Sequence, residues 1–330
     1  MSRIMIVVLS LYSFGSHVAI ADSSDGIKPW LERMAVASTE LSYKGRFIYN
    51  RNDDTSLMEI VHVAGENGSR ERIVSLSGED QELIRDQEGK VYLMNVGPPL
   101  LIDKGMRDIP LAVRLNDNLG RLLEHYCFEL EKMDRVAGRK SQVISIMPID
   151  NNRYSYRLWV DVETAFIIRS ELSNEMGDVI EHIMFSDIEL RKKPTDSMLE
   201  AVLYDEELVV ANGNGSKAPL ENANKHKGLW NVTGAPLGFR QTDSQDNVSL
   251  GTKKSVAYLM ASDGLASVSV YIEPLKNAKN VLKGASRSGA LSVYGRIVED
   301  HQVTVVGEVP PVVVKRIGDA VIRSKMSQRQ

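Results

Sequence analysis

The sequence predicts a mainly β protein of the α+β class: a large unclosed antiparallel half-barrel with a helical plug, followed by a smaller antiparallel sheet domain with one helix. Three observations predict this fold. Strand-like runs with apolar residues at alternate positions follow one another through the first 190 residues, with two helical patterns between them. Residues 211–227 are dense in Asn, Gly, Ser and Lys, which is typical of a linker. Further strand-like runs then lead to a final amphipathic helix.

Residues 1–21 have the three-part layout of a secretory signal peptide. Arg3 precedes an apolar run at residues 4–11, and Ala19 and Ala21 supply the small residues expected before a cleavage site. The run is too short to span a bilayer. We therefore expect an exported mature protein, located in the periplasm if the source is a Gram-negative cell.

The first domain is expected to span residues 22–193. A helix should begin near Ser24 or Asp25, because apolar residues then recur at intervals of three and four. Strand-like runs separated by turn-forming residues follow as far as residue 96, and Pro110 opens a second amphipathic helix.

The strongest strand pattern lies in residues 135–190. Within residues 153–161, apolar side chains occupy every second position, so one face of the strand is mostly apolar. These apolar positions are Tyr154, Tyr156, Leu158 and Val160. Short polar turns at residues 163–164 and 175–178 connect this run to the next two, which predicts a meander of four linked strands.

A sheet of about nine or ten strands is too long to stay flat and should curl into an open barrel. The interior of such a half-barrel has two possible fates. Either helices and loops fill it completely, or part of it remains a pocket for an apolar ligand. Periodicity alone favours a filled interior, because inward rows of Tyr, Leu, Val and Phe usually form a core.

Residues 194–228 are expected to form the linker and residues 229–330 a smaller C-terminal domain. Asp263 and Gly264 are a hairpin signal between its first two strand-like runs. After Pro311, apolar residues on one side predict a helix that can cover one small sheet. The strand-like runs are residues 255–262, 266–273, 290–299 and 302–308.

Composition and residue spacing point away from several classes of function. The formal net charge of −4 gives no reason to expect a nucleic-acid partner. The histidines are scattered without the spacing of metal ligands, so we expect neither a metal nor a cofactor. An exported hydrolase would need a nucleophile and a base that can be argued together, and the sequence offers no such pair. We therefore expect no enzyme.

Three local features have simple structural interpretations. Cys127 is the sole cysteine and has apolar neighbours, so we expect a buried, inert thiol. The glycine-rich residues 213–218 and 284–289 lack the surroundings of a phosphate-binding turn or a nucleophile elbow, and we interpret both as loops. Carboxylates in the meander are expected on a solvated face. They are Asp161, Glu163, Glu171 and Glu181.

Long motifs lie in both expected domains. They are RVAGR at 135–139, RYSYRLWVDVETAFIIRSEL at 153–172, SDGLASVSVYIEP at 262–274 and VTVVGEVP at 303–310, together with YKGRF at 43–47 and SLSG at 75–78. In this order, behind a signal peptide, they make the chain resemble the RseB/MucB family of periplasmic regulators of the sigma-E (AlgU) envelope-stress response. The resemblance runs over nearly the whole mature chain.

The resemblance implies a non-enzymatic switch. Members of this family bind the periplasmic domain of a single-span anti-sigma factor (RseA or MucA) and shield it from the site-1 protease DegS. The larger domain of the family is similar to the lipoprotein carriers LolA and LolB and is implicated in sensing lipid or lipopolysaccharide. The smaller domain is implicated in holding the anti-sigma factor. The family also leads us to expect a homodimer.

Two sets of candidate residues follow from joining the resemblance to the strand pattern. The candidates for contact with lipid or lipopolysaccharide acyl chains are Phe47, Tyr49, Tyr156, Leu158, Phe166 and Ile168. The candidates for contact with the anti-sigma factor are Asp263, Gly264, Val268, Val270 and Tyr271. A periplasmic lipid or lipoprotein carrier is the alternative function, since the first domain alone would explain it.

Overall fold

The computed structural model describes most of the chain outside its termini and the expected linker. The described residues are 23–51, 54–87, 91–94, 100–102, 111–202, 229–249, 255–275 and 281–323. The expected signal peptide and residues 203–228 of the expected linker lie outside these ranges. None of the helices within them is long and apolar enough to cross a membrane.

The first domain contains one large antiparallel sheet. Its strands are β1 (Ser42–Arg51), β2 (Asp54–Val63), β3 (Arg70–Ser75), β4 (Glu82–Arg85), β5 (Val91–Met94), β6 (Leu100–Ile102), β7 (Tyr126–Leu130), β8 (Asp134–Val136), β9 (Arg139–Pro148), β10 (Ser155–Asp161), β11 (Ile167–Ser173) and β12 (Val179–Arg191). The strand order is β6-β5-β4-β3-β2-β1-β12-β11-β10-β9-β7, and β8 pairs with β9. The expected meander is confirmed as β9 to β12.

The sheet curves without closing, as expected. The ends of the strand order, β6 and β7, are not paired with each other in the described part of the chain. Strands β1 and β12 join the two halves, and their register shifts between Arg46 and Phe47. A bulge of this kind bends a strand and increases its twist. Gly45 lies beside it, where a Cβ would sit 2.6 Å from the carbonyl oxygen of Asp187.

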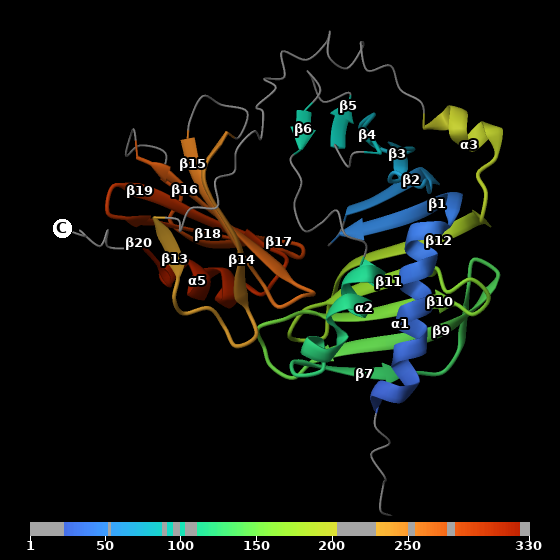
Figure 1. The fold of residues 1–330 in the computed structure, drawn as a ribbon, viewed down its shortest axis with the longest axis horizontal. Coiled ribbons are helices and arrows are strands. Elements are labelled where there is room, and N and C mark those ends of the chain that lie inside the picture. Colours follow the sequence, from blue (N-terminus) through green and yellow to red (C-terminus); the bar gives the residue numbers. More distant parts are fainter. Residues whose placement is uncertain are drawn as a thin grey trace, which may run out of the picture.

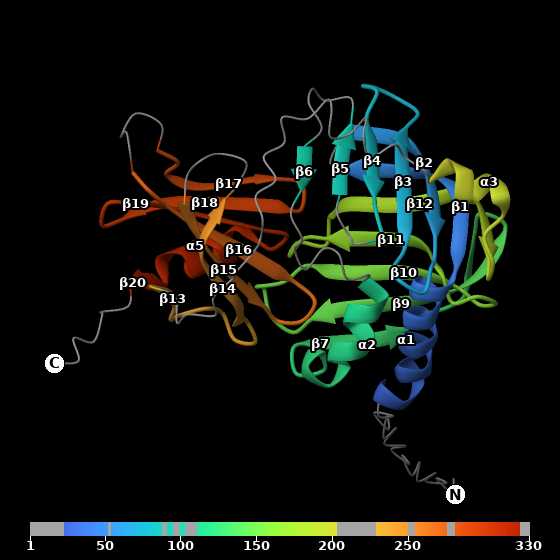
Figure 2. The ribbon, with the colours of Figure 1, turned by 45° about the horizontal axis from the view of Figure 1, so that its top comes forward.

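Helices α1 (Ser23–Glu40) and α2 (Leu111–Leu122) lie across one face of this sheet (Figures 1 and 2). Their apolar stripes, predicted from spacings of three and four residues, enter a single core with the strands. The buried helix residues are Ile27, Leu31, Met34, Ala37, Ala112, Leu115 and Leu122. Burying one large aliphatic side chain stabilises the fold by about 1.5–3 kcal/mol, so these contacts hold the helical plug in place.

A short helix, α3 (Asp196–Ala201), follows the large sheet and is capped by the Thr195 hydroxyl. It packs on β2, where Met198 and Val202 form a small cluster with Val61 and Val63. The beginning of the expected linker is therefore attached to the first domain.

The described residues of the second domain form a smaller sheet, a pair of short strands and one helix. Its strands are β13 (Trp230–Val232), β14 (Arg240–Ser249), β15 (Ser255–Ser262), β16 (Ser267–Pro274), β17 (Gly284–Ser288), β18 (Leu291–Val298), β19 (His301–Gly307) and β20 (Val321–Arg323). Six of them form a sheet in the order β14-β15-β16-β19-β18-β17, and β13 pairs with β20. Helix α5 (Pro311–Asp319) buries Val313, Val314 and Ile317 against this sheet, as its spacing predicted.

Three local predictions were wrong. Cys127 is exposed, because it lies on the edge strand β7 with its side chain turned away from the core. Asp161 is buried, because Arg139 and Thr164 bind its carboxylate at the end of β10. Gly284–Ser288 form strand β17 instead of a loop. All five residues of β17 are exposed, so it has no apolar alternation and is held by its backbone pairing with β18.

Candidate functional site

The six acyl-chain candidates converge on the core of the first domain. Phe47, Leu158, Phe166 and Ile168 are buried in the cluster that also contains α1 and α2, and Tyr49 and Tyr156 pack against it. These residues come from β1, β10, β11 and the β10–β11 connection, and their contact with acyl chains stays a prediction. The helical plug contacts this same cluster, so an acyl chain that reaches these side chains has to displace part of α1 or α2.

The two tyrosines are partly buried against this core. The Tyr49 hydroxyl lies 3.1 Å from a carboxylate oxygen of Glu181 and donates a hydrogen bond to it. Burial, followed by the charge of Glu181, raises the pKa of Tyr49 to about 12. Burial also raises the pKa of Tyr156. Both phenols therefore stay neutral at physiological pH, which suits contact with an apolar ligand.

An aromatic cluster connects the core with a cavity of about 430 Å³. Tyr43 stacks on His62 at 4.7 Å between ring centroids and lies 4.7 Å from the ring of Phe166. All three line the cavity, together with Glu71 and Arg85. His62 Nδ1 lies 3.2 Å from the Glu71 carboxylate. Burial alone would raise the pKa of Glu71, but the hydrogen bond to His62 and the charges of His62 and Arg85 lower it overall.

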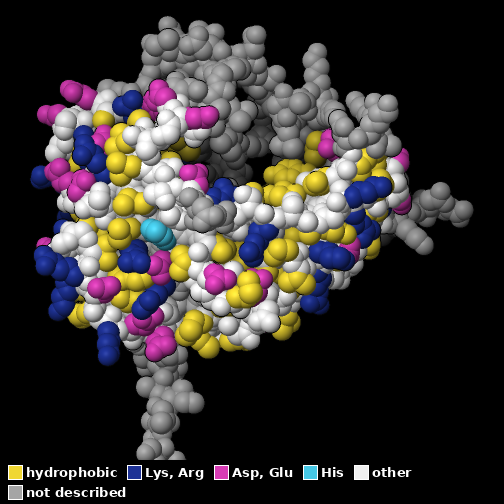
Figure 3. Space-filling view, turned by 180° about the vertical axis from the view of Figure 1, so that it is seen from behind, with side chains coloured by type: hydrophobic (Ala, Val, Ile, Leu, Met, Phe, Trp, Pro, Cys, Tyr) yellow, Lys and Arg dark blue, Asp and Glu magenta, His cyan; other side chains and the backbone are white. Residues whose placement is uncertain are grey.

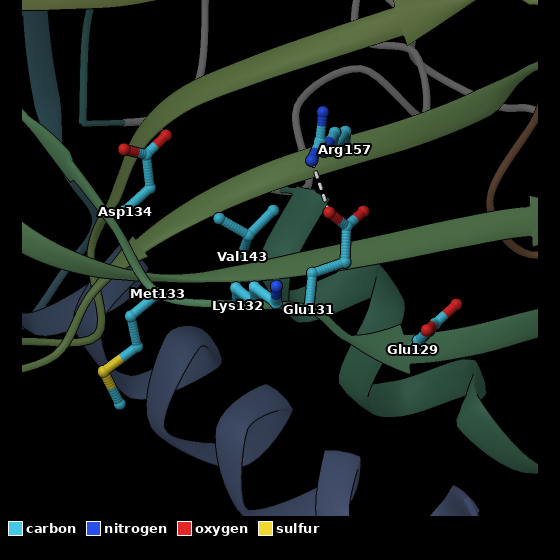
Figure 4. Close-up of a pocket in the computed structure, with 7 residues that line it drawn as sticks. All are labelled: Glu129, Glu131, Lys132, Met133, Asp134, Val143 and Arg157. Atoms are coloured by element: carbon cyan, nitrogen blue, oxygen red, sulfur yellow. Dashed lines mark hydrogen bonds and ion pairs between the residues drawn. The ribbon is translucent and has the colours of Figure 1, made fainter.

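A second hollow, of about 500 Å³, lies beside β7 to β10 and is drawn in Figure 4. Its lining mixes Glu129, Glu131 and Asp134 with Lys132 and Arg157, and Arg157 is paired with Glu131 (Figure 4). Figure 3 shows that charges of both signs are also interspersed with hydrophobic side chains over the first domain on the face turned to the viewer. None of the predicted site residues lines this hollow.

Most of the candidates for partner contact are not exposed. Val268 and Val270 are fully buried in the core of the second domain, and Tyr271 is half-buried beside Tyr258. Asp263 and Gly264 form the predicted turn between β15 and β16, but the tip of this hairpin is buried against the first domain. Their contact with an anti-sigma factor stays a prediction, and it requires the two domains to separate.

The junction between the domains is built around Arg153, which precedes β10. Its Nε lies 2.6 Å from a carboxylate oxygen of Asp263, and both side chains are completely shielded from solvent. The guanidinium also donates to the carbonyl oxygen of Leu237 over 2.6 Å and pairs with Asp150. The Tyr126 hydroxyl donates to the same carboxylate oxygen of Asp263 over 2.9 Å.

The hairpin tip also brings an apolar side chain into the first domain. Leu265 is fully buried and belongs to the same core cluster as α1 and α2. Arg114 of α2 donates a hydrogen bond to the Leu265 carbonyl oxygen over 2.6 Å. Gly264 has a φ of +105°, and a Cβ there would lie 2.4 Å from the Arg121 guanidinium and 3.0 Å from Asn118. Glycine is therefore required both for the turn and for the close approach of α2.

Further contacts extend the junction on either side. The Tyr154 hydroxyl donates to the Val309 carbonyl oxygen over 3.1 Å, and Ala290 packs in a cluster with Tyr154, Leu172 and Ile180. Strand β1 contributes Arg51, which donates to the Ser288 carbonyl oxygen over 2.8 Å. Sequence reasoning missed this junction. A single signal pointed to it, since Arg153 lies just before the apolar alternation of β10 and an arginine there needs a buried partner.

Comparison with known proteins covers both domains. Residues 27–203 match the model of the MucB/RseB N-terminal domain and residues 224–322 match that of the MucB/RseB C-terminal domain. Sigma factor AlgU regulatory protein MucB from Pseudomonas aeruginosa is 33% identical over 319 residues, which cover 93% of this chain and 94% of MucB. Sigma-E factor regulatory protein RseB from Salmonella typhimurium is 23% identical over 315 residues, which cover 93% of each chain.

Solved structures of MucB resemble the whole chain. The crystal structure of MucB in complex with MucA(peri) has a TM-score of 0.68 and 29% identity, and covers 92% of this chain and 100% of that one. The complex structure of Pseudomonas aeruginosa MucA/MucB has a TM-score of 0.66 and 28% identity, with the same coverage. The crystal structure of MucB has a TM-score of 0.61 and 27% identity, and covers 93% and 99%. The two family models together match most of this chain, and MucB is 33% identical over 93% of it. The chain therefore belongs to the MucB/RseB family.

Proposed function

We propose that this protein is a negative regulator of an envelope-stress sigma factor and that it binds the periplasmic domain of a MucA-like or RseA-like anti-sigma factor. The observation that carries this proposal is the match over both domains to MucB, at 33% identity over 93% of the chain. A carrier would need the half-barrel alone. Here the second domain is retained and docked on the first through Arg153 and Asp263.

Binding of this kind regulates by covering a partner, without a chemical step. The protein would lie in the periplasm, hold the anti-sigma factor, and shield it there from a DegS-type protease. The sigma factor then stays sequestered until the complex dissociates. The role needs two docked domains and a partner surface, and it needs no nucleophile or metal.

We further propose that acyl chains of lipid or lipopolysaccharide release the partner by entering the first domain. The cavity beside Tyr43 and Phe166 is the point of entry, because Phe166 lines this cavity and also belongs to the buried core. Burying about ten methylenes at ~0.8 kcal/mol each contributes roughly 8 kcal/mol before costs. Association and ordering cost at least ~4 kcal/mol. The remainder, at most roughly 4 kcal/mol, can cover the ~1–3 kcal/mol typical of coupling between two sites.

The test is a calorimetric titration of the delipidated protein, residues 22–330, with the periplasmic domain of the source cell's anti-sigma factor. The titration is repeated with lipopolysaccharide fragments, and light scattering reports whether the free protein is a homodimer. Micromolar or tighter binding that weakens when lipid is added supports both proposals. Binding that lipid leaves unchanged removes the lipid switch alone. Absence of binding in both titrations rejects the regulator and favours the lipid or lipoprotein carrier.

A matched pair of variants sharpens the lipid part of this test. Phe166→Trp enlarges a side chain that lines the cavity, whereas Phe128→Trp enlarges one that is buried elsewhere in the same core. If acyl chains enter at the cavity, the first variant weakens the lipid effect more than the second. Equal effects of the two variants would place lipid entry elsewhere.

A further inference from the structure

We infer that Arg153 and Asp263 are positioning residues for the anti-sigma factor. Without touching the partner, they lock the two domains in the arrangement that binds it. The inference rests on the proposed function. It assigns to Asp263 and Gly264 a role different from the direct partner contact that the sequence suggested.

The chemistry of the pair supports a lock. Each nitrogen group of Arg153 has a partner, since Nε binds Asp263, one terminal nitrogen binds Asp150, and the other binds the Leu237 carbonyl oxygen. Asp150 lies in the first domain, whereas Asp263 and Leu237 lie in the second. The Arg153 guanidinium also lies 5.1 Å from the ring centroid of Phe239. Because each nitrogen of this planar guanidinium is bonded to an acceptor, the two domains have little freedom to change their relative orientation.

Asp263 couples the lock to the shape of the hairpin. One carboxylate oxygen accepts hydrogen bonds from Arg153 and Tyr126 of the first domain. The other accepts the backbone N–H groups of Leu265 and Ala266, over 2.9 and 2.8 Å. The same carboxylate therefore folds the turn and directs Leu265 into the core of the first domain. Separating the domains would leave this carboxylate without its two partners in the first domain and would expose Leu265.

The overall similarity to MucB with and without MucA guides which state we assign to the lock. The two structures of MucB with MucA have TM-scores of 0.68 and 0.66, and the structure of MucB has 0.61. Over the whole chain, this structure therefore resembles the two complexes slightly more than it resembles the structure of MucB. We take the docked arrangement as the one that binds the partner, so that breaking the lock weakens binding.

The test measures domain spacing and partner binding separately. Spin labels at Met176→Cys and Val312→Cys, in a Cys127→Ser background, report the distance between the domains by electron–electron double resonance. Both positions are well exposed, at 73% and 56%, and lie in different domains. Into this protein we introduce Asp263→Asn. The control is Asp319→Asn, whose carboxylate makes its bonds to Tyr294 and Lys315 within the second domain.

We expect Asp263→Asn to broaden the distance distribution and to weaken binding of the anti-sigma periplasmic domain at least tenfold. Asp319→Asn should leave both readouts unchanged. Tyr126→Phe removes a single hydroxyl from the lock and should give a smaller change in the same direction, which keeps the test valid if Asp263→Asn folds poorly. The inference is overturned if Asp263→Asn and Tyr126→Phe both leave the distance distribution unchanged. It is also overturned if they alter the distance between the domains but leave the affinity for the anti-sigma periplasmic domain unchanged. If the unaltered protein does not bind, the proposed function fails first, and the distance measurement still decides whether the lock holds the domains.

Discussion

Arg153 Nε lies 2.6 Å from a carboxylate oxygen of Asp263, and both side chains are completely shielded from solvent. The two residues are 110 positions apart in the sequence and belong to different domains. A buried ion pair of this kind is costly to break from one side, because the remaining charge is left without an opposite charge. We expect Arg153→Gln to lower the free energy of unfolding by about 3–5 kcal/mol. Urea denaturation followed by tryptophan fluorescence measures this loss.

The control for Arg153→Gln is Arg157→Gln, four residues further along the chain in β10. Arg157 is paired with Glu131, but its side chain is 47% exposed. Exposed pairs contribute about 0–1 kcal/mol, so this variant should unfold almost as the parent does. Similar losses in the two variants would mean that the pair at the junction is no more important than a surface pair.

Leu265 tests whether the hairpin tip stabilises the first domain. It is fully buried in the first-domain core, whereas Leu237 of the same second domain is 78% exposed. Truncating a buried leucine usually costs about 2–5 kcal/mol through lost transfer energy and a residual cavity. We expect Leu265→Ala to show this loss in thermal or urea unfolding and Leu237→Ala to change stability by less than about 0.5 kcal/mol. Equal effects would contradict the docking of the hairpin.

Alanine variants of Gly264 and Gly177 distinguish the cost of backbone strain from the cost of a steric clash. Both Gly264 and Gly177 have positive φ, at +105° and +86°, but no atom would lie within 4 Å of a Cβ at Gly177. Gly177→Ala therefore carries the backbone penalty of about 1–2 kcal/mol alone. Gly264→Ala adds a clash with Arg121 and Asn118 of α2, so it should be clearly less stable and should also widen the domain spacing. The idea fails if both alanine variants have equal stability.

The lowered pKa of Asp161 predicts that the protein loses stability in acid. Burial alone would raise its pKa, but hydrogen bonds from Arg139 and Thr164 lower it below the ordinary value. An aspartate with a lowered folded pKa stabilises the protein above its unfolded pKa of about 3.9, and this contribution is lost as pH falls through the folded pKa. The free energy of unfolding should therefore fall as the pH drops below about 4 and through the lowered folded pKa.

The Asp161→Asn variant isolates this contribution. At neutral pH it should be less stable by about 1.5–3 kcal/mol, the usual worth of hydrogen bonds to a charged group. Its stability should also depend less steeply on pH than that of the parent. Glu163→Gln is the control, since the Glu163 side chain is 86% exposed. Parallel pH profiles for the parent and Asp161→Asn would show that this carboxylate does not titrate with folding.

Local patterns were sufficient to predict most of the elements. Alternation in residues 153–161 predicted β10, and apolar residues at intervals of three and four predicted the buried stripe of α1. Strand β17 was missed because it is exposed throughout and has no such alternation. Cys127 was misplaced because apolar neighbours in sequence do not show on which face of an edge strand a side chain lies.

The sequence by itself determined the two sets of strands, the amphipathic helices, the Asp263-Gly264 turn and, through long motifs, the family. These features depend on contacts between near neighbours or on side-chain period, which a sequence displays directly. Only the tertiary structure decided that Arg153 meets Asp263 and that Leu265 enters the core of the other domain. Such contacts join residues more than 100 positions apart, and their geometry is set by how the two domains pack, which has no period in the sequence.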